Sequence, residues 1–584
     1  MVIVGVILVV PTLVTLFLRR LAEVFLPAPM SKFTMKKNIP LLLSLLLTGV
    51  AHAGDLLSTL EQQTVSQENK ERNIQNKLQS GAHTVFTQPS DTRQEALFYP
   101  LESPCLKIRK VRIESGEIRL IPAIKRLAKS AEHQCLGATG INNLQKAIRN
   151  QLIGEGLITS RAAVTSYQAK EETLTLSLIY GRINSIRLSD DSSGHFNLAS
   201  AFPLEAGDIL NIRNVEQGLE NINALPGTLS DIRIMPSQTP GESKIEVLRK
   251  QEKYWQLASW ADNSGTKATG RYQGGAALFL NNLTSLNDIL YVSRTQNIER
   301  SDTRGNSSHA ISYSLPYGFW SVDLFAGKSK YHQGIPGYAV DYQYKGKAEN
   351  LSLQIGRTVS RGARYKTTLN AQLLERDYHY FINDTEIDLQ RKRLTNIKIG
   401  AKHLHYIDDA RVSLSLDLLK NMRWFQADHL DGAYNLSSHI IKAEASVFNP
   451  FMLSNLSMDY RGGLTLQLAN YDLPIQDKLG IGSRNTVRGF DGELNLFGNK
   501  GIYWQNTMTW NLSSVPVQPY VGIDYGYVMQ SENAVGHKLA GGIAGVRTEK
   551  WNTSLDTFIG TPLYKPHGFA TSSMNIGFSL VWRY

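Results

Sequence analysis

Long apolar runs after residue 54 and catalytic motifs are both missing from this 584-residue sequence. Beyond residue 54 there is no run of about 18 apolar residues, so helical membrane spans are not expected there. The sequence has no GxxxxGKS/T phosphate loop, no HExxH zinc motif and no GxSxG nucleophile motif. The run Gly480-Ile481-Gly482-Ser483 lacks the third glycine of a dinucleotide site, and the 13 histidines are scattered. These absences predict a protein that is not an enzyme and carries neither a cofactor nor a metal.

Acidic residues are outnumbered, since 51 Asp and Glu face 62 Lys and Arg, and the net charge is +11. Residues 1–53 hold five basic residues and one acidic residue, so the chain from residue 54 onward carries 11 − 4 = +7. The basic residues form no arm or stripe, which argues against a nucleic-acid partner. The mean hydropathy of −0.23 resembles that of a soluble protein. Transmembrane barrels give the same average, because only alternate residues of each strand face lipid.

Cysteine is almost absent: the chain has only Cys105 and Cys135. Both follow the export signal described next, and an exported pair of cysteines suggests a disulfide. Such a bond closes a loop of about 30 residues and contributes roughly 3–4 kcal/mol in the chain-entropy model. Two cysteines at this spacing lack companion ligands, so a metal site is not expected.

Two apolar runs open the chain, and the second has the form of a secretory signal. Met35-Lys36-Lys37 is its basic start, a leucine-rich core follows, and Ala51-His52-Ala53 is a small-x-small cleavage site. Residues 35–53 are therefore predicted to be a signal peptide, and the mature chain to begin near Gly54. Residues 1–34 are interpreted as an upstream extension from a wrongly assigned start. A genuine extended signal or anchor is the alternative.

Residues 54–80 are polar and typical of a helix, with no proline. Their apolar residues are too sparse to form one face of a soluble core. Composition alone leaves two interpretations open: a helix inside a water-filled cavity, or a solvated segment. Residues 81–104 follow as a linker that contains one glycine and three prolines.

Between residues 105 and 252 the pattern changes to that of two small α+β domains, 105–181 and 182–252. The first shows a short strand, two helical faces and a closing, half-buried strand, and the second a strand, a helix and two closing strands. Each unit is predicted to be of β-α-β-β type. The apolar positions that carry this prediction are Ile108 and Val111; Leu120, Ile124 and Leu127; Ile141, Leu144, Ile148 and Leu152; Leu174, Leu176 and Leu178; Ile186 and Leu188; Val215, Leu219 and Ile222; Ile232 and Ile234; and Ile245 and Val247.

Residues 253–584 lose the helical period and alternate with a period of two over segments of about ten residues. A soluble β-sandwich also alternates in this way. The export signal, the number of segments and the aromatic residues near strand ends favour a transmembrane β-barrel instead. At roughly 20 residues per strand and connection, this region holds about 16 antiparallel strands, an even number as in bacterial barrels. The last strand is the clearest, with Met574, Ile576, Phe578, Leu580, Trp582 and Tyr584 at every second position.

Residues 478–501 are rich in glycine and polar residues, which predicts a long loop rather than a strand. Within this loop lies the tetrad Val487-Arg488-Gly489-Phe490. Downstream, the alternation in 519–527 predicts a strand whose Val521, Ile523, Tyr525 and Tyr527 face lipid. Gly522, Asp524 and Gly526 then face the lumen, where an ionised carboxylate is tolerated and the glycines leave room for a loop.

These residues resemble the transporters of two-partner secretion, a family of hemolysin, filamentous hemagglutinin and contact-dependent growth inhibition exporters. In that family a VRGF or VRGY tetrad lies at the tip of a long extracellular loop folded back into the barrel, and its arginine contacts an aspartate on the inner barrel wall. The resemblance implies an Arg488–Asp524 contact, with Gly526 in the partner motif. A pair in a water-filled lumen is expected to add only about 0–1 kcal/mol. An incidental loop arginine and a solvated aspartate are the alternative.

The resemblance covers nearly the whole mature chain. Ser103-Pro104-Cys105 is similar to the start of the family's first POTRA domain, and residues 261–270 look like the segment that leads into its barrel. The resemblance also implies that residues 54–80 are a plug helix, that 105–181 and 182–252 are two periplasmic POTRA domains, and that the barrel lies in the outer membrane.

The family's function implies the partners. POTRA domains capture an unfolded exoprotein, for which edge-strand addition gives affinity with little sequence demand. The cargo then threads the lumen and folds outside the cell. The expected partners are a secreted β-helical exoprotein encoded nearby, outer-membrane lipid, and the barrel-assembly machinery during biogenesis. The cargo is expected to be a hemolysin, an adhesin or a contact-dependent growth inhibition toxin.

Two other classes of outer-membrane protein share some of these features. An insertase of the barrel-assembly type also has POTRA domains and a VRGF loop, but residues 105–250 have room for only two POTRA domains and such insertases carry more. A passive porin has none. The insertase is therefore the second hypothesis.

Overall fold

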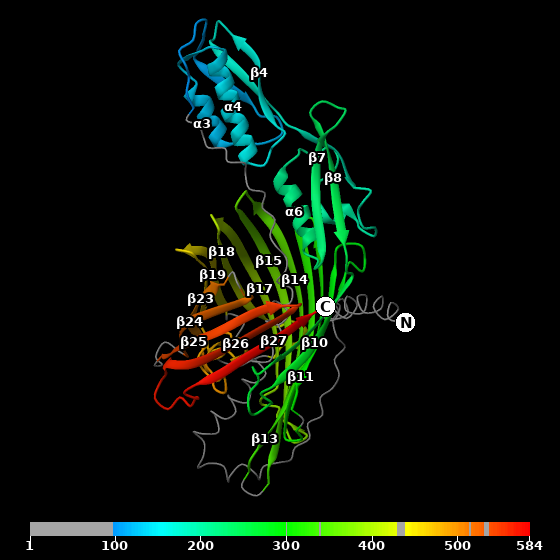
Figure 1. The fold of residues 1–584 in the computed structure, drawn as a ribbon, viewed down its shortest axis with the longest axis vertical. Helices are drawn as coiled ribbons and strands as arrows, with labels where there is room; N and C mark the ends of the chain where they lie inside the picture. The colour runs from blue at the N-terminus through cyan, green and yellow to red at the C-terminus, as the bar shows by residue number, and fades with distance from the viewer. Residues whose placement is uncertain (1–96, 300, 338–339, 429–438, 513–514, 531–535) are drawn as a thin grey trace.

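Two small domains are stacked at one end of a closed β-barrel in the computed structural model (Figure 1). The predicted segments 1–34, 35–53 and 54–80 lie outside the described residues, as does most of the linker. The structure describes residues 97–299, 301–337, 340–428, 439–512, 515–530 and 536–584.

The first small domain packs two helices against a three-stranded sheet. Its elements are β1 (Leu106–Ile108), β2 (Lys110–Glu114), α3 (Pro122–Ser130), β3 (Gln134–Leu136), α4 (Ala138–Gly154), β4 (Arg161–Gln168) and β5 (Thr173–Ile179). The sheet has the order β2-β5-β4, with β5 parallel to β2 and antiparallel to β4. Ile124, Leu144 and Leu174 are fully buried between the layers, as their apolar spacing predicts.

This domain departs from the predicted β-α-β-β arrangement. The prediction omits β4, because its sequence RAAVTSYQ has no regular apolar alternation. β5 is a central strand rather than a half-buried one, since Leu174, Thr175 and Leu176 are all buried. A separate small sheet pairs β1 with β3. Cys135 of β3 forms a disulfide with Cys105, with Cα atoms 5.4 Å apart.

The second small domain has the predicted strand, helix and two closing strands, with one additional short helix. Its elements are β6 (Arg182–Leu188), α5 (Leu198–Ala201), α6 (Ile212–Asn223), β7 (Thr228–Pro236) and β8 (Glu242–Gln251). The sheet order is β6-β8-β7, with β8 in the centre and α6 packed on its face. Val215, Ile222 and Ile245 are fully buried in this core.

Sixteen antiparallel strands of the described residues close the barrel, and the two-residue segment β16 (Thr385–Glu386) extends one edge of β15. The number agrees with the predicted count. The strands are β9 (Trp255–Asp262), β10 (Gln273–Asn281), β11 (Ile289–Asn297), β12 (Arg304–Tyr317), β13 (Trp320–Ile335), β14 (Tyr342–Arg361), β15 (Tyr365–Ile382), β17 (Lys392–Ile407), β18 (Ala410–Met422), β19 (His439–Leu453), β20 (Leu456–Ala469), β23 (Lys500–Asn511), β24 (Val517–Met529), β25 (His537–Lys550), β26 (Thr553–Tyr564) and β27 (Asn575–Arg583). β27 pairs with β9 and closes the ring.

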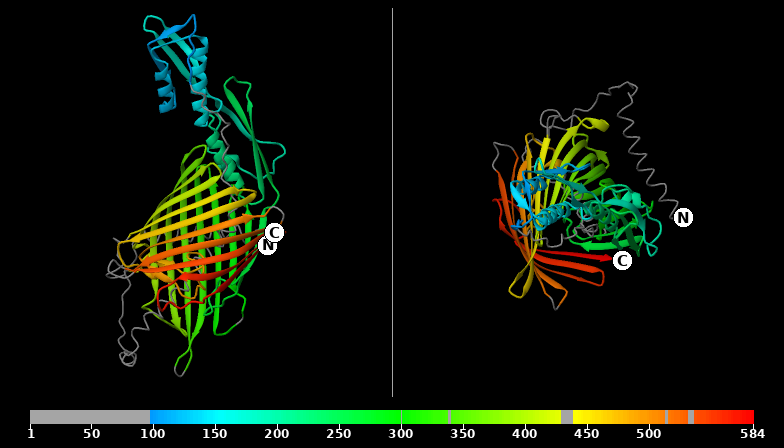
Figure 2. Two further views of the ribbon diagram at one scale, coloured as in Figure 1. Left: turned by 60° about the vertical axis from the view of Figure 1, so that its left-hand side comes forward. Right: turned by 90° about the horizontal axis from the view of Figure 1, so that it is seen from above.

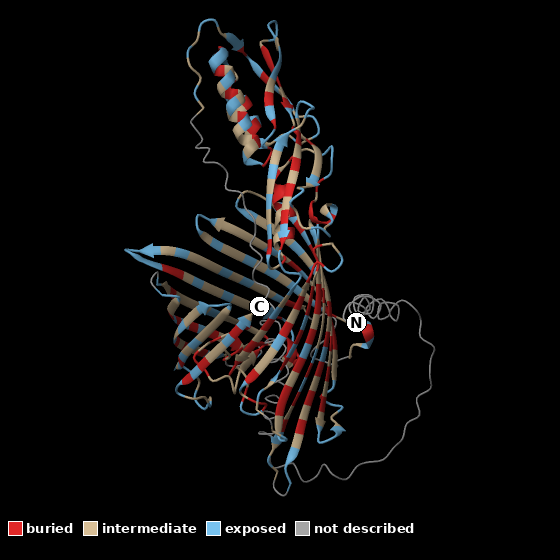
Figure 3. Cartoon of the chain, turned by 45° about the vertical axis from the view of Figure 1, so that its right-hand side comes forward, coloured by how far each residue is buried: buried red, intermediate tan, exposed pale blue. Residues whose placement is uncertain are grey.

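Buried and exposed positions alternate along the barrel strands (Figure 3). On β24, Val521, Ile523 and Tyr525 are exposed on the outer face, whereas Asp524 is buried on the inner face. The alternation confirms the two faces that the sequence predicts. Among the described residues, no helix has both the length and the apolar character that crossing a membrane requires.

The two ends of the barrel differ in their connections. At the end that carries the small domains, several hairpins have turns of two residues, such as Gly318-Phe319 and Asp408-Asp409. At the opposite end, longer segments such as 470–499 join the strands. Bacterial barrels have short periplasmic turns and longer extracellular loops. The small domains, which Figure 2 (left) shows beyond one end of the barrel, therefore lie on the periplasmic side.

Candidate functional site

The segment 470–499 between β20 and β23 reaches the inner wall of the barrel. The sequence predicts a continuous loop over 478–501, and this prediction is only partly correct. The segment contains the short helix η2 (Ile475–Asp477) and a small sheet of β21 (Leu479–Ile481) and β22 (Leu496–Gly498), and β23 already begins at Lys500. Three-residue strands in a glycine-rich context leave no usable alternation in the sequence. We call residues 470–499 the inner loop.

Arg488 of the inner loop and Asp524 of β24 lie in direct contact. The carboxylate of Asp524 accepts hydrogen bonds from Arg488 Nε (2.6 Å, to Oδ2), Nη2 (2.7 Å, to Oδ1) and the backbone N–H (2.9 Å, to Oδ2). Arg488 Nη2 also donates to the carbonyl of Asn506 on β23 at 2.9 Å, and the N–H of Asn506 donates to Asp524 Oδ1 at 3.2 Å. Two neighbouring strands therefore hold the tip of the inner loop.

This contact is shielded from solvent, contrary to the expected pair in a water-filled lumen. The side chain of Asp524 is 1% exposed and that of Arg488 is 16% exposed. Removal of one partner from a buried ion pair costs about 3–5 kcal/mol, because the other charge stays buried and unpaired. The expected water-filled setting of this pair is therefore wrong, since the loop itself covers the carboxylate.

Two glycines allow the tip of the inner loop to approach the wall. A Cβ atom on Gly526 of β24 would lie 2.6 Å from Cγ2 of Val487. Gly489 has φ +106°, and a Cβ atom there would lie 2.6 Å from the carbonyl oxygen of Thr561. A side chain at either position requires the loop to move, and the positive φ favours glycine at position 489.

Apolar packing supports the same tip. Val487 and Phe490 are 0% and 2% exposed. Val487 packs in a cluster with Ile481 of β21 and with Val528 and Leu539 of the wall, and Phe490 belongs to the same cluster. The ring of Phe490 meets the ring of Phe569 edge to face, with centroids 5.9 Å apart. All four residues of the tetrad are thus in contact with the barrel or with the loop's own sheet.

Comparison with known proteins shows which family the chain belongs to. The family model described as "Haemolysin secretion/activation protein ShlB/FhaC/HecB" matches residues 241–548. The chain belongs to this family. A ShlB-type POTRA domain model matches residues 106–181, and a second POTRA model matches residues 182–236.

Individual relatives agree with this assignment. The chain is 30% identical over 509 residues to the outer membrane transporter CdiB-2 of Burkholderia pseudomallei, which covers 82% of this chain and 87% of that protein. It is 26% identical over 469 residues to the hemolysin transporter protein ShlB of Serratia marcescens, covering 78% and 82%. The structure of CdiB from Acinetobacter baumannii covers 90% of this chain and 99% of its own, with TM-score 0.78 and 26% identity.

The chain is thus an outer-membrane transporter of two-partner secretion, with its two POTRA domains in the periplasm and a secreted exoprotein as its partner. The second hypothesis, a barrel-assembly insertase, is not supported.

Further contacts of the transporter's inner loop join it to the segment between β9 and β10. The backbone N–H of Lys267 donates to both carboxylate oxygens of Glu493 at 3.0 and 3.1 Å. Arg484 Nη2 donates to the carbonyl of Asn263 at 3.0 Å. Residues 261–270, which the sequence singles out only by resemblance, therefore contact the loop. The sequence carries no signal for these contacts, because the partners are more than 200 residues apart.

A second buried ion pair, which sequence reasoning missed, lies at the start of the inner loop. Asp477 accepts a hydrogen bond of 2.6 Å from Arg376 of β15, and the two side chains are 4% and 5% exposed. Arg376 also donates to Asn396 Oδ1 on β17 at 2.7 Å. Strand alternation places Arg376 on the inner face of the barrel, and this position is the only sequence signal that could have indicated the ion pair.

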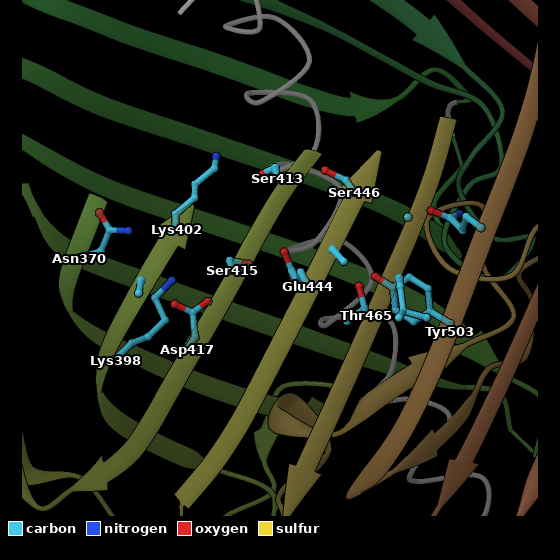
Figure 4. Close-up of a pocket in the computed structure, with 15 residues that line it drawn as sticks. Asn370, Lys398, Lys402, Ser413, Ser415, Asp417, Glu444, Ser446, Thr465 and Tyr503 are labelled. Carbon is cyan, nitrogen blue, oxygen red and sulfur yellow. The ribbon is translucent and has the colours of Figure 1, made fainter. Parts of the chain in front are cut away.

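The inner wall opposite β9–β12 carries small and charged polar side chains (Figure 4). A pocket of about 370 Å³ lies along β15, β17, β18, β19, β20 and β23. In the described residues no group of three or more His, Cys, Asp or Glu could hold a metal. The residues labelled along this wall are Asn370, Lys398, Lys402, Ser413, Ser415, Asp417, Glu444, Ser446, Thr465 and Tyr503.

Proposed function

We propose that the inner loop is the gate of a pore that exports a large β-helical exoprotein, most specifically a contact-dependent growth inhibition toxin encoded by a neighbouring gene. The observation that carries the gate is the shielded Arg488–Asp524 contact, which fixes a loop tip to a wall that cargo must pass. The choice of cargo rests on the resemblance to transporters named CdiB. Hemolysins and adhesins are the other cargoes that this family suggests.

The polar wall in Figure 4 supports passage of an extended polypeptide. Serine and threonine side chains at Ser413, Ser415 and Thr465 offer hydrogen bonds of both kinds without an apolar surface on which a chain would stick. Lys398 and Asp417 add charges of both signs, so the wall favours neither acidic nor basic cargo.

The POTRA domains supply free strand edges for cargo capture. Among the described residues, β4 pairs only with β5 and β7 pairs only with β8, so each has one edge open to strand addition. Leu229 on β7 is 69% exposed and offers an apolar contact to an added strand. In this proposal the other partners are outer-membrane lipid around the barrel and the barrel-assembly machinery during biogenesis, with no nucleic acid and no catalytic step.

The test of the gate is the substitution Arg488→Ala in a strain that carries the cargo gene. We expect cargo release to fall and ion conductance of the purified protein in planar bilayers to rise, while heat-modifiable migration shows a folded barrel. Arg547→Ala is the matched control, because Arg547 pairs with Asp556 on the neighbouring strand at 3.1 Å, within the wall. If the folded Arg488→Ala variant secretes cargo and conducts ions like the original chain, the proposed role of the inner loop as a gate is contradicted.

The cargo is tested separately by the gene next to this one. A co-transcribed gene for a very large exported protein with a toxic C-terminal end, whose secretion depends on this transporter, is the expected result. A neighbouring hemolysin or adhesin with the same dependence would overturn the toxin assignment and leave the gate untouched.

A further inference from the structure

Four basic residues gather on the outer face of β13 and β14, near the extracellular end of the barrel. Lys330 of β13 lies directly opposite Lys347 of β14 in the strand register, and His332 lies opposite Lys345. Their side chains point outward, because Ser329, Tyr331 and Ala348 between them are buried on the inner face. This end of β13 extends furthest from the POTRA domains (Figure 1). We call Lys330, His332, Lys345 and Lys347 the outer basic patch.

The outer basic patch borders the apolar band that faces lipid. On the same face of β14, Leu351 and Leu353 follow four and six residues after Lys347 towards the periplasm. At about 3.3 Å per residue, Lys347 lies about 13 Å along the strand from Leu351, and about 10 Å in height after strand tilt. Lysine side chains at the edge of a bilayer extend towards the headgroups. The patch therefore lies at the headgroup level of the outer leaflet.

An aromatic neighbour marks the same level. Nζ of Lys347 lies 4.6 Å from the centroid of the Phe381 ring on β15. Barrels place aromatic residues in girdles where lipid meets water. Phe381 can rest among acyl chains while Lys347 contacts a headgroup.

Two lysines of the patch face each other without an acid to balance them. Like charges directly opposite on one face of a sheet destabilise the pair. Elsewhere in this region the charges are matched, because Lys328 pairs with Glu349 and Lys345 pairs with Asp384 at 2.9 Å. Within the described part of the chain, neither Lys330 nor Lys347 forms an ion pair.

The patch lines an open groove of about 770 Å³. Two acids also line this groove. Glu299 is paired with Arg304 at 2.7 Å, which leaves Asp302 as the opposing charge. Lys345 is likewise paired with Asp384, so Lys330 and Lys347 against Asp302 leave the groove positive. An anion of matching size is the ligand that this surface favours.

We propose that the outer basic patch binds the phosphate groups of an outer-leaflet glycolipid, with Lys330 and Lys347 clamping one phosphate between them. A phosphate has three acceptor oxygens and can accept a charge-assisted hydrogen bond from each lysine. The bound anion removes the repulsion between the lysines, and the acyl chains lie on the leucine band below. The ligand is a phosphorylated lipid rather than free phosphate, because the groove sits beside the apolar band.

The test is binding of fluorescent, bisphosphorylated lipopolysaccharide to the full chain in detergent micelles, followed by fluorescence polarisation. The variant Lys330→Gln/Lys347→Gln is expected to bind about tenfold to a hundredfold more weakly, the loss typical of charge-assisted hydrogen bonds. The variant Lys330→Arg/Lys347→Arg keeps both charges and is expected to bind within a few-fold of the original chain. It also keeps the test valid if the Gln variant folds poorly, which heat-modifiable migration reports.

The matched control is Lys253→Gln/Lys550→Gln. These lysines also lie over aromatic rings, those of Tyr584 and Trp551, but at the periplasmic end. Unchanged binding by this control and weaker binding of a dephosphorylated glycolipid are expected. Equal binding by the Gln variant and the original chain, or equal loss in the control, would overturn the proposal. Displacement of the glycolipid by millimolar inorganic phosphate would overturn its assignment to a lipid.

Discussion

Gly526 decides whether the tip of the inner loop can dock. Its neighbour across the gap is the side chain of Val487, and a methyl group would intrude to 2.6 Å. We expect Gly526→Ala to weaken the docked state by about 1–3 kcal/mol, the usual cost of overpacking. Limited proteolysis of intact cells should then cut the inner loop faster.

Gly463 offers the matched control, because it lies on the same polar inner wall and a Cβ atom there would meet nothing within 4 Å. Gly463→Ala should leave the rate of loop cleavage unchanged. Equal cleavage rates for the two alanine variants would contradict a steric role for Gly526.

The inner loop as an element has a second anchor at its start, the Arg376–Asp477 pair. We expect Asp477→Asn to weaken the docked state of residues 470–477 by about 3–5 kcal/mol, because the buried guanidinium of Arg376 then loses the negative charge of Asp477. Hydrogen exchange of the peptide over 470–477 is the measurement, and faster exchange is the expected result.

Asp472→Asn controls for that experiment within the same element. Asp472 pairs with Lys478 at 2.9 Å, but its side chain is 61% exposed. Exposed pairs contribute about 0–1 kcal/mol, so exchange should change little. Faster exchange in Asp472→Asn than in Asp477→Asn would contradict the ranking by burial.

Helix α4 in the first POTRA domain depends on a carboxylate from outside the helix. Its N-cap residue, Gly137, has no side chain, and Glu102 accepts hydrogen bonds from the N–H groups of Thr139 (2.9 Å) and Gly140 (2.8 Å) instead. Hydrogen bonds from the side chain of Thr139 and from these N–H groups lower the pKa of Glu102 below its usual 4.5. A carboxylate is also favoured at a helix N-terminus.

The pH dependence of α4 follows from the direction of that shift. A lowered pKa in the folded state means that the contribution of Glu102 is complete above about 4.5 and is lost as the pH falls through the folded value. We expect amides 138–142 to exchange faster in Glu102→Gln than in the original chain at pH 7, and the difference to shrink as the pH falls below 4. A difference that is independent of pH would contradict this role.

The whole molecule is joined at a charged interface between the second POTRA domain and the barrel. Arg361 of β14 lies beside Glu216 (3.5 Å) and Glu220 (2.7 Å) of α6, and Lys366 of β15 also pairs with Glu220. Asn221 of α6 donates to the carbonyl of Gly318 at 2.7 Å. The side chains of Glu216 and Arg361 are 0% and 3% exposed, so the POTRA domain and the barrel rim exclude solvent from this contact.

We expect Glu220→Gln to weaken the interaction between the second POTRA domain and the barrel by about 1.5–3 kcal/mol, the value of hydrogen bonds to charged groups. Spin labels on α6 and on the barrel should report a broader distance distribution, and cargo secretion should fall. Glu205→Gln is the control, because Glu205 is exposed on the same domain. A distance distribution as narrow as that of the original chain would contradict the role of Glu220.

The sequence by itself determined the strand count and the two faces of each strand. Alternation is a local property, so the inward position of Asp524 can be predicted without knowledge of its neighbours. The pairing of Arg488 with Asp524 came only from the resemblance of the tetrad and the Asp-x-Gly strand to a family. The same approach missed β4, whose edge position needs no regular apolar pattern.

Only the tertiary structure decided which distant residues meet. Burial of the Arg488–Asp524 pair depends on the loop covering the wall, and the Arg376–Asp477 and Arg484–Asn263 contacts join residues about 100 and 221 positions apart. The facing lysines Lys330 and Lys347 depend on the register between β13 and β14, and a slip of one residue would point either of them into the lumen. Register and coverage are set by the closed barrel as a whole, and short stretches of sequence do not encode them.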